Sequence, residues 1–371
     1  MTGRAAIVHE WLTVPGGSEK VVLSILELLP QAEIFTSVYD PAPWPRAITD
    51  RPVHTSFLNR IPRAEQIYPK LLPLMNAAFE SFDLTGFDVV VSSSHSCAKN
   101  VITGPNTLHV CYCHTPMRHA WEPRFLAGED LGPAARLAAA ALGGRLRRQD
   151  LAGASRPDVF VANSSHVAAR IAKYYRRDAV VIHPPVAVAP GLATPRAPDD
   201  YYLVFGRLVP YKRADLAVAA CASLGRRVKV VGDGRAIESV RAVAGPDAEF
   251  LGAVDDAELP ALMAGARALI FAGEEDFGIV PVEAQAAGVP VIAYGVGGVR
   301  DSVIDGQTGV FFAEQTVESC AAGILAFEDV EGELEEQAIR ANAERFAPHR
   351  FAEAFTALLA EHGADHPAGV A

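Results

Sequence analysis

The chain has 371 residues, half of them hydrophobic, and a formal net charge of −11 at pH 7. This length suffices for two domains with separate cores, and no apolar run approaches the ~20 residues that span a bilayer. An acidic chain whose basic residues are not gathered into one stripe is also a poor candidate for binding nucleic acid. The short apolar stretch before His9 and Glu10 is unlike a signal peptide, and five cysteines without framework spacing fit a reducing compartment. We therefore expect a cytoplasmic protein.

Charge is distributed unevenly along the chain. Residues 1–190 hold 19 Lys and Arg against 16 Asp and Glu, a net charge of +3, whereas the remainder has a net charge of −14. Within the first half, residues 55–84 and 131–151 alternate apolar side chains with arginines and lysines. Basic amphipathic stretches can lie on anionic lipid, but amphipathic helices packed on their own domain produce the same pattern. Peripheral contact with the inner face of a membrane is one hypothesis for these stretches, and ordinary packing is the other.

The first half predicts a mainly parallel sheet. Short apolar runs are separated by helical or loop segments, which is typical of βαβ units. The runs are residues 5–8, 88–91, 108–111 and 159–162.

A glycine loop follows the first of these predicted strands. Gly16 and Gly17 have no side chains, so their backbone can approach a ligand closely. Ser18 is expected to cap the following helix, which should end near Leu29. The loop lacks the third glycine and the acidic residue of the dinucleotide-binding fingerprint, which argues against a dehydrogenase.

Histidines follow two of the predicted strands. His114 lies in Cys-His-Thr-Pro-Met-Arg, residues 113–118, at the carboxyl end of a strand, where catalytic groups collect in α/β proteins. A hydrogen-bonded structural histidine is the alternative. Arg118 is a candidate contact for an acceptor or a phosphate, and His95 is expected to line the same site.

Proline marks the boundary between the two predicted domains. Residues 184–198 contain five prolines, which exclude an interior helix or a central strand. We therefore predict an N-terminal domain over 1–185, a second domain over 199–347 and a C-terminal helical segment over 348–371.

Residues 271–290 predict a strand, a glycine-bearing loop and a helix that begins at Pro281. Glu275 and Glu283 lie eight positions apart in this segment. Two carboxylates would repel a phosphate and are better suited to accept hydrogen bonds from sugar hydroxyls at the two ends of a glycosylated diphosphate. Ordinary solvated or capping glutamates are the alternative.

Cations suited to a diphosphate occur earlier in the second half. Arg207 and Lys212 flank the loop after the predicted strand at 201–207, and an arginine with a lysine can neutralise a diphosphate. Gly232 lies in the turn after another predicted strand, where a turn of this kind borders a nucleotide.

The run EDFGIVPVEAQAAGVPVIA resembles the donor-site signature of the retaining glycosyltransferase family 4. Members of this family have the α/β GT-B fold, in which two Rossmann-like domains with mainly parallel sheets face a central cleft. The resemblance implies that Glu275 contacts the transferred sugar and that Glu283 holds the ribose. Phe277, Gly278 and Ile279, between the two glutamates, are then donor-site residues as well.

Two further segments share the resemblance. Gly-Arg-Leu with the following lysine matches the family segment in which two cations, here Arg207 and Lys212, grip the donor diphosphate. The run YCHTPMRHAWE is similar to a subgroup that often transfers mannose, in which a histidine, here His114, reaches the transferred sugar. The loop with Gly16 and Gly17 resembles the one that borders the donor phosphates.

The function that the resemblance implies is transfer of a sugar from a nucleotide diphosphate donor to a glycan, lipid-linked or small-molecule acceptor. GDP-mannose is the favoured donor and a UDP-linked sugar is the second choice. A nucleotide-sugar epimerase or an inactive sugar-nucleotide binding protein remains an alternative. The chain has no D-x-D carboxylate pair, so we expect neither an essential metal nor a cofactor. In this fold the last helix, here within 348–371, crosses back to the first domain.

Overall fold

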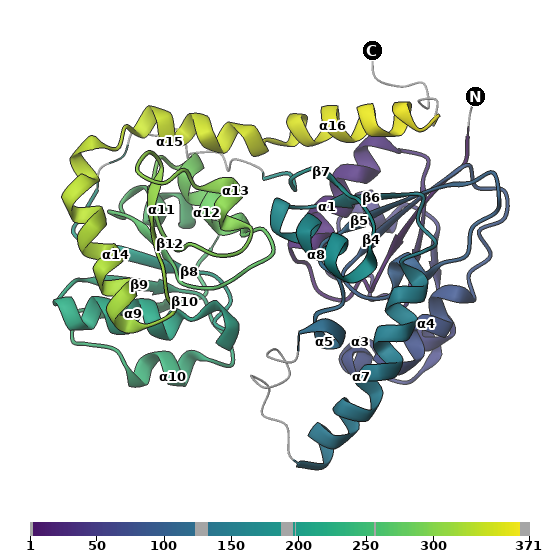
Figure 1. Cartoon of the computed structure of the whole chain (residues 1–371), viewed down its shortest axis with the longest axis horizontal. Helices are drawn as coiled ribbons and strands as arrows, with labels where there is room; N and C mark the ends of the chain where they lie inside the picture. Colours follow the sequence, from purple (N-terminus) through teal and green to yellow (C-terminus); the bar gives the residue numbers. More distant parts are fainter. Residues whose placement is uncertain (1–2, 123–132, 187–195, 197, 256, 364–371) are drawn as a thin grey trace. The chain divides into compact units, whose positions relative to one another are not determined.

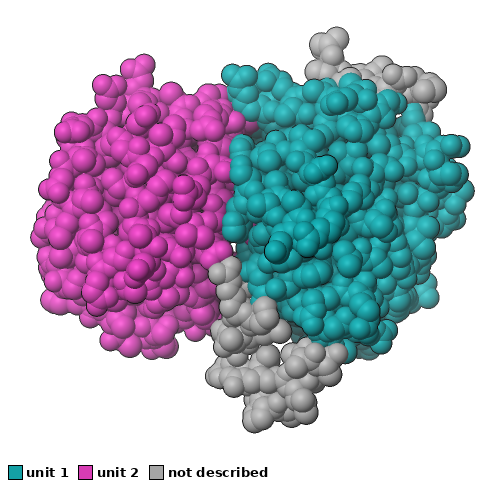
Figure 2. All heavy atoms as spheres, viewed as in Figure 1, with its two compact units in different colours: residues 1–185, 348–371 teal, residues 186–347 magenta. Residues whose placement is uncertain are grey.

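The computed structural model describes residues 3–122, 133–186, 196, 198–255 and 257–363. Residues 131–132 of the second basic stretch, most of the proline-rich linker and the last eight residues of the chain lie outside this description. The chain divides into two compact units, one of residues 1–185 with 348–371 and the other of residues 186–347 (Figures 1 and 2).

A seven-stranded, all-parallel sheet forms the centre of the first unit, with the order β3-β2-β1-β4-β5-β6-β7. Chain order reverses between β1 and β4, which is the topological switch point where α/β proteins bind ligands. The strands are β1 (Ala5–His9), β2 (Glu33–Thr36), β3 (Val53–Thr55), β4 (Val89–Ser94), β5 (Leu108–Cys113), β6 (Val159–Ala162) and β7 (Val180–Val181).

Alternation along β1 explains how this sheet is covered on both faces. Ile7 points into a core cluster with α1 (Gly17–Leu28) and α16 (Pro348–Glu361), whereas Ala6 and Val8 point into another cluster with α4 (Leu72–Glu80). Because both faces are buried, the strands appear in the sequence as continuous apolar runs, and the four predicted strands are confirmed. The short strands β2 and β3 were missed by sequence analysis, because they lack such a run.

The helices of the first unit come from both ends of the chain. Helix α16 packs beside α1 through Phe351, Phe355 and Leu358 (Figure 1). The helices are α1 (Gly17–Leu28), α2 (Arg46–Thr49), α3 (Ala64–Ile67), α4 (Leu72–Glu80), α5 (Arg118–Trp121), α7 (Pro133–Gly153), α8 (Ser165–Tyr175) and α16 (Pro348–Glu361), with the 3₁₀ helices η1 (Phe57–Arg60), η2 (Tyr68–Leu71) and η3 (Ala98–Asn100).

The predicted cap of α1 was wrong. Gly16, not Ser18, occupies the N-cap position, and no side chain caps this end. Ser18 lies within the first turn, where its hydroxyl donates to the Glu19 carboxylate at 2.9 Å. The Glu19 carboxylate folds back toward Gly16 at the helix start, where its own backbone N–H also contributes a hydrogen bond.

The second unit repeats the arrangement with six parallel strands in the order β10-β9-β8-β11-β12-β13. Chain order reverses here between β8 and β11. The strands are β8 (Tyr202–Phe205), β9 (Val228–Val231), β10 (Ala248–Gly252), β11 (Leu269–Phe271), β12 (Val291–Tyr294) and β13 (Gly309–Phe312).

Helices on both faces of the second sheet complete the unit. Val204 on β8 packs in a cluster with α9 and α14, and its neighbour Leu203 packs in a cluster with α12. The helices are α9 (Ala214–Leu224), α10 (Ile237–Ala242), α11 (Leu259–Ala264), α12 (Ile279–Ala286), α13 (Val299–Ser302), α14 (Val317–Val330) and α15 (Glu336–Ala343), with the 3₁₀ helices η4 (Pro210–Lys212), η5 (Glu331–Glu333) and η6 (Glu344–Phe346).

Helix α12 begins two residues earlier than predicted. Gly278, with φ 84°, is its N-cap, so Pro281 occupies the third helical position. Proline is tolerated there because the first four N–H groups of a helix have no acceptor within the helix. At the other end Gly288 has φ 78°, and its N–H and that of Val289 bond back to Gln285 and Ala284, so the helix ends just before this glycine.

No helix in the described part of the chain combines the length and apolar character that crossing a bilayer requires.

A buried carboxylate ties together the switch point of the first unit. Glu10 follows β1, is fully buried, and accepts five hydrogen bonds from the last residue of β4 and the turn after it. The donors are Ser94 Oγ at 3.0 Å and the backbone N–H groups of His95 at 3.2 Å, Ser96 at 2.7 Å, Cys97 at 3.0 Å and Ala98 at 3.0 Å.

These contacts determine the ionisation of Glu10. Burial alone would raise its pKa, but His95, the N–H groups of Ala98 and Cys97, and Lys99 outweigh burial and hold the pKa below its ordinary value. A depressed carboxylate pKa stabilises the fold above the ordinary glutamate value of about 4.5, and this stabilisation is lost as the pH falls through the folded-state value.

We expect Glu10→Gln to lower the free energy of unfolding by about 3 kcal/mol at pH 7, because the amide would point donors at donors. The difference from the wild type should shrink as the pH is lowered below 4.5, because the carboxyl of the unfolded wild type gains its proton there and that of the folded protein follows at a lower pH. Chemical denaturation at several pH values measures this, with Glu27→Gln at an exposed position of α1 as the control. Equal stability of Glu10→Gln and Glu27→Gln would contradict the expectation.

Candidate functional site

Polar side chains collect at the carboxyl ends of β1, β4 and β5, which are neighbours in the first sheet. His9 ends β1, Ser93 lies near the end of β4, and His114 follows β5 directly. Ser93 Oγ lies 2.8 Å from His114 Nε2 and 3.1 Å from His9 Nδ1. The structure thus places the predicted His114 at the switch point of the first unit.

His114 is held firmly by its surroundings. Its backbone N–H donates to Ser94 O at 2.8 Å, and its carbonyl accepts from Asn163 Nδ2 at 3.0 Å. Burial and the neighbouring His95 and His9 lower the pKa of His114 to about 3. The ring is therefore neutral at physiological pH, and it can exchange hydrogen bonds with a hydroxyl group without adding charge.

His95 belongs to the same cluster. Its ring lies edge-on to Trp11 at 4.7 Å, and its centroid is 6.4 Å from those of His9 and His114. Burial lowers the pKa of His95, although Glu10 acts in the opposite direction. Arg118, the other residue singled out nearby, begins α5.

Glu19 was not identified from the sequence, although it belongs to this cluster. Its buried carboxylate lies 3.1 Å from His9 Nε2. Gly16 makes room for it, because a Cβ atom at Gly16 would lie 2.9 Å from Glu19 Oε2. Gly17 is the first residue of α1. The sequence feature that could have pointed to Glu19 is its position two residues after a glycine pair at the start of a helix.

In the second unit, three predicted residues border one pocket at the switch point. Lys212 Nζ lies 2.9 Å from Glu275 Oε1, and both side chains are mostly buried, with exposed fractions of 19% and 18%. Arg207 is exposed at the rim of the same pocket. Arg207 and Lys212 come from the segment after β8, and Glu275 from the loop after β11, so they meet where chain order reverses.

Glycines allow these loops to pack backbone against backbone. A Cβ atom at Gly232, after β9, would lie 2.0 Å from the carbonyl oxygen of Gly206. A Cβ atom at Gly298, after β12, would lie 2.1 Å from the carbonyl oxygen of Asp276. The Gly298 N–H donates to Glu275 O at 2.9 Å, so this glycine loop supports the backbone of Glu275 directly.

The remaining predicted residues surround the start of α12. The Phe277 side chain is buried in the core, with its ring centroid 5.4 Å from that of Phe346. Gly278 is the N-cap, Ile279 is the first helical residue, and Glu283 lies partly buried in the second turn. Any ligand contact from Phe277 would therefore come from its backbone.

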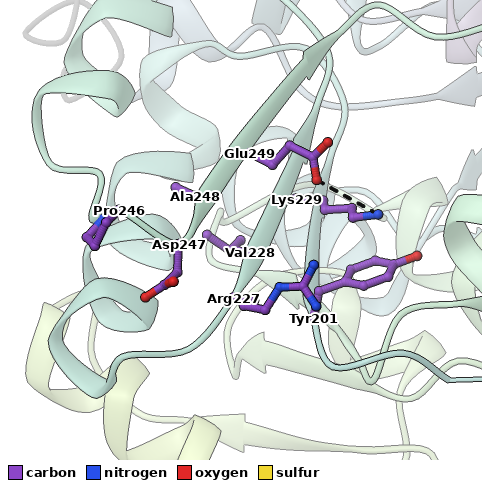
Figure 3. A pocket seen from close by; sticks show the side chains of 8 residues that line it. All are labelled: Tyr201, Arg227, Val228, Lys229, Pro246, Asp247, Ala248 and Glu249. Atoms are coloured by element: carbon purple, nitrogen blue, oxygen red, sulfur yellow. Dashed lines mark ion pairs between the residues drawn. The ribbon is translucent and has the colours of Figure 1, made fainter.

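A second pocket, of about 220 Å³, lies at the opposite, amino ends of β8, β9 and β10 (Figure 3). Its cations are already paired. Lys229 Nζ lies 3.9 Å from Glu249 Oε2 and 4.2 Å from the centre of the Tyr201 ring, and Arg227 lies 3.8 Å from Asp199. Because it lies at the amino ends of the strands, away from the switch point, it is a poorer ligand site than the pocket at Lys212.

Both halves of the chain match known families. Residues 15–189 match the family described as Glycosyltransferase Family 4, and residues 194–345 match the family described as Glycosyl transferases group 1.

Curated relatives match over short segments. A glycogen synthase of Mycobacterium tuberculosis is 41% identical over 81 residues, which is 22% of this chain and 20% of the relative. A GDP-mannose-dependent alpha-mannosyltransferase of the same species is 38% identical over 118 residues, 31% of each chain. The chain thus spans about a fifth to a third of the length of these curated relatives.

Solved structures match over nearly the whole chain at low identity. A sucrose-phosphate synthase from Thermosynechococcus elongatus is 18% identical with a TM-score of 0.72, covering 98% of this chain and 99% of that one. The Anabaena protein HepE, solved with UDP-glucose, is 17% identical with a TM-score of 0.68, covering 96% and 99%. With the two parallel sheets, these likenesses show the GT-B fold. Each half of the chain therefore matches a glycosyltransferase domain family, the first half family 4 and the second half group 1.

Proposed function

We propose that this chain is a retaining glycosyltransferase that moves a hexose from a nucleotide diphosphate donor to a glycan, lipid-linked or small-molecule acceptor. The observation that carries the proposal is the ion pair between Lys212 and Glu275 in the pocket at the switch point of the second unit, with Arg207 at its rim. The match to two glycosyltransferase families supports it.

The chemistry follows from where charge develops. As the bond between sugar and diphosphate breaks, negative charge grows on the leaving diphosphate, and fixed cations stabilise that state more than the ground state. The Lys212 ammonium, which forms an ion pair with Glu275, has three N–H donors that can reach a diphosphate. Because Arg207 adds a second cation, the proposed reaction needs neither a metal ion nor a cofactor.

The two glutamates bind the two ends of the donor in this proposal. Glu275 holds Lys212 in place, and its second oxygen accepts a hydrogen bond from the transferred sugar. Glu283 accepts from the ribose, near the N–H groups at the start of α12, which favour the donor's oxygens. Gly232, Gly278 and Ile279 contribute backbone contacts to the nucleotide.

The first unit supplies the sugar contact and the loop at the donor phosphates. His114 hydrogen-bonds a hydroxyl of the transferred sugar as a neutral ring, which agrees with its lowered pKa. Gly16 and Gly17 border the donor phosphates.

GDP-mannose is the proposed donor. The run at residues 113–118 supports it, as does the similarity to a GDP-mannose-dependent mannosyltransferase over 31% of the chain. A UDP-linked sugar is the second candidate, because HepE, a protein of the same fold, was solved with UDP-glucose. A nucleotide-sugar epimerase would use the same donor pocket without any acceptor.

Removing either member of the ion pair should impair turnover. We expect Lys212→Ala and Glu275→Gln each to lower kcat by about 100-fold or more, because each removes one transition-state contact. Lys229→Ala, which breaks a lysine–glutamate pair in the other pocket, is the matched control and should retain nearly full activity. Near wild-type rates in both site variants would overturn the assignment.

Nucleotide preference is read most directly from thermal stabilisation. Since a ligand that binds the folded state raises Tm, we expect GDP to raise it more than UDP, ADP, dTDP or NAD. Lys212→Ala should abolish the shift and Lys229→Ala should preserve it. A shift with UDP alone would discard mannose transfer but keep the transferase, and a shift with NAD alone would contradict both.

We also propose that the first unit contacts anionic lipid peripherally. Phe57 and Leu74, within the first basic stretch, are 44% and 48% exposed, and Arg60, Arg63 and Lys70 are exposed beside them in the sequence. Exposed apolar groups among cations suit a membrane interface.

Vesicle flotation tests this lipid contact. Arg60→Glu with Arg63→Glu should weaken binding to anionic vesicles about tenfold or more, because each basic residue near such a surface contributes about 1 kcal/mol. Arg227→Glu with Arg241→Glu, at exposed positions of the second unit, changes the net charge equally and should have little effect. No flotation of the wild type would refute the proposal.

A further inference from the structure

Helix α12 presents different side chains on its two sides. Residues two positions apart on a helix point in nearly opposite directions, because each residue turns the helix by about 100°. Glu283, the proposed ribose contact, is partly exposed, whereas Gln285 is fully buried on the side that faces α13 and α15. A buried amide is costly unless its donors and its acceptor have partners, so the contacts of Gln285 matter for the fold.

The partners of Gln285 fix the orientation of its amide. Gln285 Nε2 donates to Pro281 O at 3.0 Å and to Ser302 O at 2.9 Å. Its Oε1 accepts from Asn342 Nδ2 at 2.6 Å. Because carbonyl oxygens only accept, a flipped amide would bring its own oxygen against both of them. Asn342 is oriented in the same way, since Arg345 Nη1, which only donates, contacts its Oδ1 at 2.7 Å.

The carbonyl of Ser302 joins three helices. It accepts from Gln285 on α12 at 2.9 Å and from Asn342 on α15 at 2.7 Å, and Ser302 is itself the last residue of α13. Helix α13 has four residues and begins after Gly298. The Gly298 N–H donates to Glu275 O at 2.9 Å. The loop that carries Glu275 is therefore tied to α12 through α13.

We infer that Gln285 is a positioning residue, which through Ser302 and α13 sets the spacing between Glu275 and Glu283. Its importance for donor binding rests on the proposed function, in which these two glutamates bind the two ends of the donor. The tie between α12 and the loop of Glu275 does not depend on that function.

The spacing of the two glutamates affects some ligands more than others. A nucleotide sugar reaches both Glu283 and Glu275 in the proposed binding mode, whereas a nucleoside diphosphate lacks the sugar that Glu275 contacts. A loosened loop should therefore weaken the complete donor more than the diphosphate. If Gln285 were merely structural, its loss would lower Tm and leave both affinities of the folded protein unchanged.

Hydrogen exchange tests the tie without any ligand. Gln285→Met keeps the approximate size of the side chain and removes its hydrogen bonds. We expect the Gly298 N–H to exchange about tenfold faster or more in this variant, because its loop opens locally more often. Mass spectrometry of peptides that contain Gly298 measures this exchange.

Tyr202→Phe is the matched control for the exchange experiment. It removes a buried hydrogen bond of the same unit, from the Tyr202 hydroxyl to Glu328 Oε1 at 2.7 Å, at the amino end of β8. This variant should leave the exchange of Gly298 unchanged. Equal exchange in Gln285→Met and the wild type, or equally faster exchange in Tyr202→Phe, would overturn the inference.

Calorimetry tests the consequence for the donor. In Gln285→Met we expect the Kd of GDP-mannose to rise about tenfold, as when one contact is lost, and the Kd of GDP to rise less than about threefold. Tyr202→Phe should change neither value. If the wild type prefers UDP, the same comparison uses UDP-glucose and UDP. Faster exchange of Gly298 with equal changes in both Kd values would refute the role in donor binding.

Asn342→Ala provides a second variant if Gln285→Met does not fold. It leaves Gln285 bonded to Ser302 O and removes the other hydrogen bond to that carbonyl, so its effects should have the same direction and be smaller. Unchanged exchange of Gly298 in Asn342→Ala would contradict the tie. A wild type that binds no nucleotide sugar would overturn the proposed function, and the exchange result would still decide the inference.

Discussion

The buried carboxylate of Glu10 is the constraint on which the switch point of the first unit depends. Four consecutive backbone N–H groups after β4 converge on it, an arrangement that could otherwise hold a bound anion. By filling this position from within the chain, Glu10 fixes the turn that carries His95 and sets the end of β4, where Ser93 lies. The contacts of His114 therefore depend on a residue that does not touch it.

The loops at the switch point of the second unit are held in place without a carboxylate like that of Glu10. Its loops approach one another through glycine, and backbone lies against backbone at Gly232 and Gly298. A Cβ atom at Gly273 would lie 2.9 Å from Lys212 Cα, so this glycine allows the loop that carries Glu275 to approach Lys212 closely. The loops at the two switch points are thus held in different ways, by a buried carboxylate in the first unit and by glycines in the second.

The sequence was most informative where apolar runs end. The runs before His114, Arg207 and Glu275 placed all three at the carboxyl ends of strands, because parallel strands buried on both faces must be continuously apolar. The resemblance to glycosyltransferases added their roles, which remain proposals.

Long-range pairing could not be predicted from the sequence. Glu19 and His9 come from different elements and meet only when α1 folds against β1, so no spacing rule links them. The start of α12 was missed because Gly278 adopts a left-handed conformation and moves the helix two residues ahead of its proline. Strands β2 and β3 are short. Because β3 lies at the sheet edge and is partly exposed, its sequence has no continuous run of apolar residues.

The two ends of the chain meet in the first unit, and this has a consequence for the order of synthesis. Phe351, Phe355 and Leu358 of α16 cover a cluster that α1 and the first sheet form from residues more than 160 positions earlier. The second unit, continuous over 186–347, is fully synthesised before that helix exists. During translation the group 1 half can therefore complete its core first, while the earlier half keeps an apolar surface open until its last helix is made.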